Sequence, residues 1–235
     1  MIPPKIFPKV KDSSIDIFAI CDHNSAWNVR AFCDYGKRFY PEIVVIPGIE
    51  ITTQEEIHVV SLFPTVEVVE KLSAFLEDLL PQVETHPNIY YPQQVVNFEG
   101  KLLREVSKPL YYSVSLDLEG AVRVIKEYGG IVICAHVDRP SFSVVSQLGV
   151  IPEGLFDVVE ISPRCCEEIV STRNVRMKNI EFSIPPGLPI IASSDAHSLD
   201  EIGIVKIRLN LSSYKFESLL ESIRDQIQIE VMRDD

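Results

Sequence analysis

The sequence predicts an α/β fold, either a barrel or a doubly wound sheet. Continuous apolar runs, such as those at 15–20 and 131–135, are typical of strands buried on both faces. Segments with apolar residues at helical spacing separate these runs, and this alternation is typical of parallel sheets with crossover helices. Since the chain has 235 residues and no linker-like segment, we expect residues 1–235 to form a single domain.

The first third of the chain predicts closely spaced elements. Apolar periodicity, proline positions and turn residues predict, in order, a helical turn near 4–10, a strand at 15–20, a helix carrying Trp27, Ala31, Phe32 and Tyr35, strands at 42–52 and 56–63, and a helix at 66–80. Asn24 or Ser25 could cap the helix around Trp27. The turn-like segment 52–56 makes the two strands around it antiparallel neighbours, which would set Glu50 beside His58.

The rest of the chain begins with its least regular segment. Residues 81–113 contain Pro81, Pro87, Pro92 and Pro109, and we interpret them as a lid-like excursion in which His86 could contact substrate. The pattern then predicts a helix at 115–128, a strand at 131–135, a helix at 141–148, a strand at 156–162, a helix at 165–179, strands at 188–194 and 204–209, and a helix at 216–227.

Composition limits the function classes. The formal net charge of −12 argues against a broad surface for nucleic acid or anionic membrane, although metal ions could still attract a small phosphorylated substrate. No apolar run is long enough to span a membrane, and the first residues lack the apolar core of a signal peptide. The cysteines have no CxxC spacing, and Cys21 and Cys134 lie within apolar runs. We therefore expect reduced thiols and a cytoplasmic protein.

Histidines and carboxylates follow the predicted strands. His23, His58, His136 and His197 lie at or beside strand ends, together with Asp22, Glu50 and Asp195. A core histidine bonded to a backbone carbonyl explains one such position easily but explains the whole set poorly. Mixed imidazole and carboxylate ligands suit Zn, Mn or Fe, and bridging carboxylates could join two or three ions. The sequence therefore predicts a metal site at the rim of the sheet.

These motifs, in this order, resemble the PHP (polymerase and histidinol phosphatase) family. The resemblance rests on Asp22-His23 after the first apolar run, Pro-Gly-Ile-Glu50, His58-Val-Val, Ala-His136-Val-Asp-Arg139, and Asp195-Ala-His197. It implies a distorted (β/α)7 barrel with a di- or trinuclear metal site at its carboxyl-terminal rim. It also implies phosphoester hydrolysis, for which the family's substrates include histidinol phosphate, nucleotides and DNA 3′ ends.

The resemblance also implies roles for single residues. Glu50, His58 and His136 would bind one metal, His23 and His197 a second, and Glu50 with Asp195 a third. Asp22 would orient the neighbouring ligand. Arg139 would either bind a substrate phosphate or form a surface ion pair, and both interpretations stay open. Cys21 stands where the family usually has threonine, and we expect it to be a buried strand residue.

The start of the sequence departs from the family. PHP proteins open with a strand that ends in His-x-His and continues into a loop and the first helix. The segment beginning Met1-Ile2-Pro3 resembles the start of that helix, and nothing before it matches the strand. We therefore expect a barrel without its first strand, either because the gene start is misplaced or because the protein is shortened. Such a barrel would lack ligands for part of the site, and its open sheet edge could pair with a second copy of the chain.

The sequence thus predicts a metal-dependent phosphoesterase that hydrolyses a small phosphorylated substrate, a phosphomonoester or nucleotide, by metal-activated water. A degenerate PHP module that binds metal with little or no catalysis is the main alternative, because the His-x-His pair is missing. An amidohydrolase-like enzyme that cleaves C–N bonds is a third possibility, which the Asp195-Ala-His197 ending disfavours. The sequence does not identify the substrate or the metals.

Overall fold

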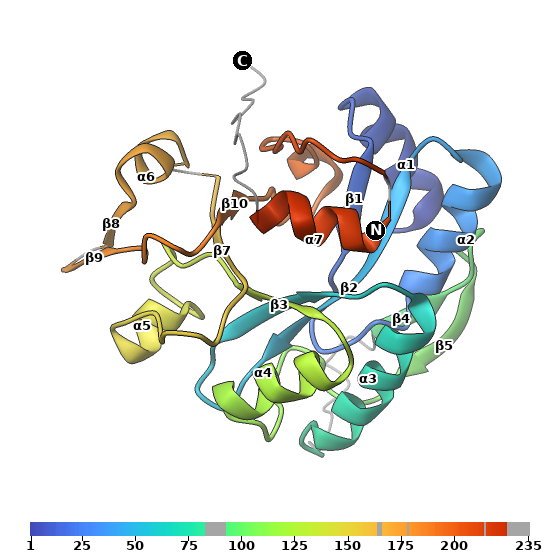
Figure 1. The fold of residues 1–235 in the computed structure, drawn as a ribbon. Coiled ribbons are helices and arrows are strands. Elements are labelled where there is room, and N and C mark those ends of the chain that lie inside the picture. Colours follow the sequence, from blue (N-terminus) through green and yellow to red (C-terminus); the bar gives the residue numbers. More distant parts are fainter. Residues whose placement is uncertain (83–92, 164–165, 178, 214, 225–235) are drawn as a thin grey trace.

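The computed structural model describes residues 1–82, 93–163, 166–177, 179–213 and 215–224, which form a mixed α/β fold. Its main sheet has six strands in the order β1-β2-β3-β6-β7-β10. Their bounds are β1 Ile17–Ile20, β2 Val44–Thr52, β3 His58–Leu62, β6 Ile131–Cys134, β7 Val158–Ile161 and β10 Ile190–Ala192. Strand β3 is antiparallel to β2 and β6, whereas the other pairs are parallel. The sheet curls into a half-barrel (Figure 1). This confirms the predicted α/β class, while the seven-stranded barrel stays a prediction.

The helices follow the sequence pattern in most places. They are α1 Pro3–Asp12, α2 Val29–Phe39, α3 Val66–Leu79, α4 Leu118–Glu127, α5 Val144–Leu148, α6 Cys166–Thr172 and α7 Phe216–Arg224, with a short 3₁₀ helix at Leu199–Glu201. Side-chain caps start three of them, since Thr65 accepts from the Val68 N–H, Asp117 from the Gly120 N–H and Ser143 from the Ser146 N–H. Helices α2, α3 and α4 lie against the convex side of the curled sheet (Figure 1).

Side-chain alternation divides each strand of the sheet between two cores. On the convex side, Ile49, Val59 and Cys134 pack with apolar residues of α2, α3 and α4. On the concave side, Leu62, Ile131, Ile133, Val158 and Ile191 pack with Leu219 and Ile223 of α7. Helix α7 therefore closes one end of the half-barrel, near the start of β6.

The two edges of the sheet border a large cavity. Among the described residues, β1 pairs only with β2, and β10 pairs only with β7. A cavity of about 1460 Å³ extends between these edges, with Phe18 and Ile20 of β1 and Ile191 of β10 in its wall. The same cavity reaches His23, Glu50 and Asp195 at the carboxyl ends of the parallel strands.

Several predicted elements were wrong. Residues 93–106 of the predicted irregular segment 81–113 form a hairpin, β4 (Gln93–Val96) with β5 (Leu102–Val106). The predicted helix 165–179 ends at Thr172, and a second hairpin comes after it, β8 (Asn174–Met177) with β9 (Ile180–Ser183). Segment 204–209 is not a strand, because the Val205 N–H and C=O bond to the Ser194 side chain instead of to another strand.

Other predictions have mixed outcomes. Asn24 and Ser25 do not cap α2, which begins four residues after Ser25 at Val29. His86 lies outside the described residues, so its predicted contact with substrate stays a prediction, as does the lid role of 81–113. Cys21 and Cys134 are free thiols, as expected. In the part of the chain that the structure describes, no helix is long and apolar enough to cross a membrane.

Candidate metal centre

The concave face of the sheet changes from apolar to polar along the strands. Towards α7 it carries the apolar residues of the concave core, whereas two residues further along the same strands it carries ionisable and hydroxyl groups. Val158 is followed on this face by Glu160, Ile191 by Ser193, and Val60 is preceded on the antiparallel strand by His58. The polar groups therefore form a layer at the open end of the half-barrel, directly above the apolar layer.

His23 and Glu50 are neighbours in the continuation of the β1–β2 ladder. An isolated parallel bridge joins them beyond the end of β1. The Glu50 N–H donates to the Asp22 carbonyl at 3.1 Å, and the Asn24 N–H donates to the Glu50 carbonyl at 2.7 Å. This pairing turns both side chains to the same face, where His23 Nδ1 lies 2.8 Å from Glu50 Oε2.

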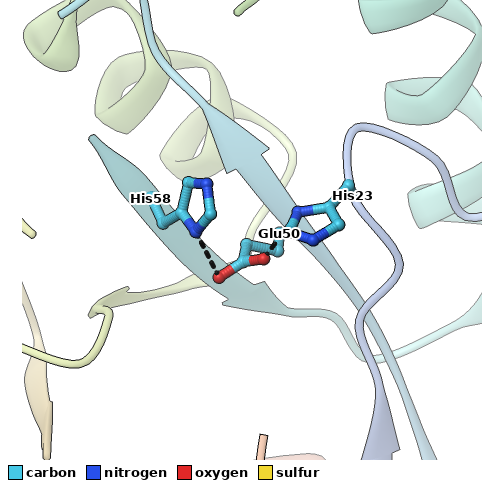
Figure 2. Close-up of side chains that lie close together, drawn as sticks. All are labelled: His23, Glu50 and His58. Carbon is cyan, nitrogen blue, oxygen red and sulfur yellow. Dashed lines mark ion pairs between the residues drawn. The ribbon is translucent and has the colours of Figure 1, made fainter. Parts of the chain in front are cut away.

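His58 and His136 approach the other oxygen of Glu50. His58 lies opposite Thr52 in the β2–β3 register, which makes it a diagonal neighbour of Glu50. His58 Nδ1 lies 3.1 Å from Glu50 Oε1, and His136 Nε2 lies 3.5 Å from the same atom. His58 Nδ1 and His136 Nε2 are 3.2 Å apart. Figure 2 shows Glu50 between His23 and His58, as the predicted antiparallel pair requires.

The electrostatics of this cluster favour a charged carboxylate. Burial opposes ionisation of Glu50, but hydrogen bonds from His136, His23 and His58 together outweigh it and hold the pKa of Glu50 well below its usual range. The hydrogen bond to Glu50 also raises the pKa of His23. Glu50 is therefore an anion with histidine nitrogens on both of its oxygens, in a largely buried position.

Glu160 is a functional-site residue that the sequence analysis did not single out. Its side chain is buried and accepts hydrogen bonds from the Ser193 hydroxyl and, at 3.3 Å, from the His136 N–H. Burial raises the pKa of Glu160, against the opposing hydrogen bond from Ser193. A charged residue inside the apolar run 156–162 was the sequence signal that could have identified it, because such a residue needs a buried polar partner.

Asp195 and His197 lie beside the cluster rather than in it. Among the described residues, His23, Glu50 and His58 form the group whose ligand atoms lie within 4.8 Å of one another. The His23 and His197 rings have centroids 6.0 Å apart, and the His197 side chain is 64% exposed. Asp195 Oδ2 lies 2.6 Å from Arg139 Nη2, so the ion pair that was one of two interpretations of Arg139 is present.

The Asp22 side chain is hydrogen-bonded to the residue that precedes α2. Its carboxylate accepts a 3.2 Å hydrogen bond from Asn28 Nδ2, and burial raises its pKa. The sequence suggested that Asp22 orients His23. Among the described residues, however, no hydrogen bond joins the Asp22 and His23 side chains. Burial also raises the pKa of Cys21 well above its usual value. Cys21 was expected to be a buried strand residue, but it directly follows the end of β1 and is half-buried.

The donor atoms around Glu50 have the spacing of ligands to one metal ion. Bonds of about 2.0–2.1 Å in a tetrahedral arrangement separate neighbouring donors by about 3.3–3.4 Å. Glu50 Oε1, His58 Nδ1 and His136 Nε2 lie 3.1, 3.2 and 3.5 Å from one another, whereas His23 Nδ1 lies 2.8 Å from the other Glu50 oxygen, Oε2. His136 Nδ1 is buried with no hydrogen-bond partner among the described residues. Imidazole and carboxylate donors at these distances fit a divalent transition metal.

Comparisons with known proteins agree with this picture. Residues 177–226, which include Asp195 and His197, match a family model described as PHP-associated. No curated protein sequence matches the chain. The chain is similar in structure to the lesion-specific endonuclease from Pyrococcus furiosus, with 16% identity and a TM-score of 0.61 over 95% of this chain and 51% of that one.

Two further structures share the fold. One is an endonuclease Q complex with a 27-mer duplex carrying an abasic lesion, with 14% identity and a TM-score of 0.62 over 95% of this chain and 52% of that one. The other is a proposed metal-dependent phosphoesterase from Bifidobacterium adolescentis, with 14% identity and a TM-score of 0.52 over 94% of this chain and 90% of that one. The chain thus spans about half the length of the two endonuclease structures. The match at residues 177–226 agrees with the PHP resemblance of the motifs in that segment, and the likeness to the solved structures shows the shared fold.

Proposed function

We propose that this chain is a metal-dependent phosphoesterase whose ion is held by Glu50, His23, His58 and His136. The observation that carries the proposal is the spacing of nitrogen donors around the buried Glu50 carboxylate, whose oxygens lie 2.8 Å from His23 Nδ1, 3.1 Å from His58 Nδ1 and 3.5 Å from His136 Nε2. A divalent ion bound there supplies Lewis-acid activation of water and of a phosphoester oxygen. The PHP-associated match and the likeness to a proposed metal-dependent phosphoesterase support this reaction class.

The protein residues have separate tasks in this proposal. Glu50 supplies negative charge to the ion, and the histidines supply neutral nitrogen donors. The cavity that reaches His23 and Glu50 gives a substrate access from between the sheet edges. Arg139 lies at the same rim, and a guanidinium has more N–H donors than its contact with Asp195 uses. The predicted role of Arg139 in binding a substrate phosphate is therefore retained.

We propose a small phosphorylated molecule, a phosphomonoester or nucleotide, as the substrate. Support comes from the net charge of −12, which disfavours a long polyanion, and from the burial of Glu50 and His136. One endonuclease neighbour is lesion-specific, and the other holds duplex DNA with an abasic lesion at its active site. Duplex DNA with an abasic site is therefore the comparison substrate for any activity test.

Glu50→Gln provides the sharpest test of the reaction. The amide keeps the shape of Glu50 but loses its charge and one oxygen, so we expect metal affinity and phosphoester turnover each to fall by at least about 100-fold. Turnover is measured with p-nitrophenyl phosphate, its diester, a nucleotide and an abasic-site duplex, after chelation and return of Mn²⁺ or Zn²⁺. Glu153→Gln, at an exposed position, is the matched control and should behave as the wild-type protein.

Each result of this test has a defined meaning. Metal-dependent turnover that Glu50→Gln abolishes supports the proposal, and the preferred substrate assigns the class. Tight metal binding without turnover of any substrate would favour the alternative, a PHP module that binds metal with little or no catalysis. Two observations favour that alternative: His197 is exposed, and Asp195 is paired with Arg139. Only the donors around Glu50 are then gathered in one place, which is enough for a single ion. Turnover that persists in Glu50→Gln would overturn the proposed site.

A further inference from the structure

The ion pair between Arg139 and Asp195 links two loops at the rim of the sheet. Arg139 follows β6 and Asp195 follows β10, and Arg139 Nη2 lies 2.6 Å from Asp195 Oδ2. The two side chains are 35% and 25% exposed, so the pair is partly shielded from water. At this distance and with this partial burial, the pair is a charge-assisted contact, which is stronger than a fully exposed surface ion pair.

Local structure holds both partners in place. The Arg139 N–H donates to the His136 carbonyl at 2.9 Å, and the Arg139 carbonyl accepts from the Ser143 hydroxyl at 2.7 Å at the start of α5. Asp195 adopts a left-handed backbone conformation with φ 45°, and its carbonyl lies 2.8 Å from His197 Nδ1. The pair is therefore formed by two turns that each have their own hydrogen bonds.

The rim carboxylates differ in the positive groups that accompany them. Glu50 has histidine nitrogens on both oxygens, and these nitrogens can exchange a proton for a metal ion. Asp195 instead has a guanidinium, which does not lose its proton in proteins. His197, the other donor expected near Asp195, has its Nδ1 4.0 Å from Asp195 Oδ1. A divalent ion at Asp195 would therefore meet a fixed positive charge on the same carboxylate.

We propose that Arg139 is the resident cation of Asp195, so that the site takes one divalent ion, at the Glu50 cluster, and excludes a second. This inference rests on the proposed function, because it requires that the Glu50 cluster bind metal. It replaces the two or three ions that the family resemblance implies with a single ion and a guanidinium. The positive charge of Arg139 then neutralises the Asp195 carboxylate, as a second metal ion would otherwise do.

The test counts metal ions with and without the guanidinium. Stripped protein is titrated with Zn²⁺ alone in a calorimeter, and bound zinc is measured after gel filtration. We expect one tight ion in the wild-type protein and in Arg139→Lys. Arg139→Met removes the charge but keeps much of the aliphatic part of the side chain. In this variant we expect a second zinc ion to bind, with an affinity at least about tenfold higher than that for any second zinc ion in the wild-type protein. The double variant Arg139→Met, Asp195→Asn should return to one ion.

Controls separate this inference from the proposed function. Arg30→Met removes the same charge from a surface pair with Glu67 and Glu70, and should leave one ion bound. Circular dichroism checks that each variant is folded. Two tight ions in the wild-type protein, or an unchanged count in folded Arg139→Met, would overturn the inference alone. Zinc absent from the wild-type protein would instead overturn the proposed function, and the inference with it.

Discussion

Asn24 connects three segments around the candidate metal centre. Its side chain is fully buried, and its backbone is left-handed, with φ 47°. The amide Nδ2 donates to the carbonyls of Leu110 and Tyr112 at 2.8 and 2.9 Å, and Oδ1 accepts from the Thr52 N–H at 2.9 Å. Asparagine is among the few residues that tolerate this backbone conformation. Asn24 therefore holds the loop after His23 against the end of β2.

We predict that Asn24→Ala lowers the free energy of unfolding by about 2–4 kcal/mol, because it leaves buried backbone groups without partners and strains the left-handed backbone. Asn24→Asp should also destabilise, since a carboxylate would face the Leu110 and Tyr112 carbonyls. Urea unfolding gives the measurement. Asn97→Ala, in the exposed turn of the β4–β5 hairpin, is the control and should cost less. An Asn24→Ala protein as stable as this control would contradict the prediction.

Single residues mark what the sequence could and could not predict. The convergence of His23, Glu50, His58 and His136 was predictable because each lies at or near the end of an apolar run, where strand ends converge, while their role as metal ligands stays a prediction. The partner of Arg139 was not predictable, because Arg139 and Asp195 come from loops far apart in the chain and either could have faced water. The burial of Asn24 was missed for the same reason, since its hydrogen-bond partners lie in loop 110–112.

At the scale of elements, the β4–β5 hairpin is tied to the site through Asn28, at the start of α2. Asn28 Nδ2 donates to the Gln94 carbonyl at 3.1 Å and to Asp22 Oδ2 at 3.2 Å, and Asn28 Oδ1 accepts from the Val96 N–H at 3.0 Å. Val95 and Val106 of the hairpin line the cavity that leads to His23. One side chain thus connects the candidate site, the start of a helix and the strand that covers the cavity.

We predict that Asn28→Ala increases amide hydrogen exchange throughout β4 and β5 by about tenfold or more, because the hairpin loses two hydrogen bonds to the body of the protein. Exchange measured by mass spectrometry or NMR on the metal-free protein reads the effect directly. Asn174→Ala, in the β8–β9 hairpin, loses a bond to Ser183 and should leave β4–β5 exchange unchanged. Equal exchange in the wild-type protein and Asn28→Ala would show that other contacts hold the hairpin.

Both hairpins escaped sequence prediction for a physical reason. In β5, Leu102, Leu103, Arg104 and Glu105 are exposed, and β9 alternates between half-buried and exposed residues. Strand β5 lacks the apolar run that identified the central strands, whereas β8 and β9 alternate between polar and apolar residues over only four residues each, and β8 was assigned to the helix predicted at 165–179. The central strands β6 and β7, by contrast, are buried throughout and were predicted within a few residues of their ends. The periodicity of apolar residues in a sequence reflects which residues are buried. It therefore identifies the buried strands of the main sheet better than the more exposed hairpins around it.

At the scale of the whole molecule, the half-barrel leaves β1 and β10 as edges in the part of the chain described here. Their unpaired backbone groups face the cavity of about 1460 Å³, and apolar side chains such as Phe18 are only half-buried. Edge strands of this kind form hydrogen bonds readily with another extended segment. The polar layer with Glu50 lies at the open end and α7 closes the other, so a pairing strand would enter between the two edges.

We predict that this edge lets two copies of the chain associate, so the mass measured by light scattering should rise from one chain towards two as protein concentration increases. Ala19→Lys tests the edge, because Ala19 is an exposed residue of β1 and a lysine on an edge strand opposes pairing through its charge. This variant should remain monomeric at concentrations where the wild-type protein associates. Its folding is checked by circular dichroism, and Gln147→Lys, at an exposed position of α5, is the control for added charge. A wild-type protein that stays monomeric at every concentration would exclude self-association through β1, and association unchanged by Ala19→Lys would assign it to another surface.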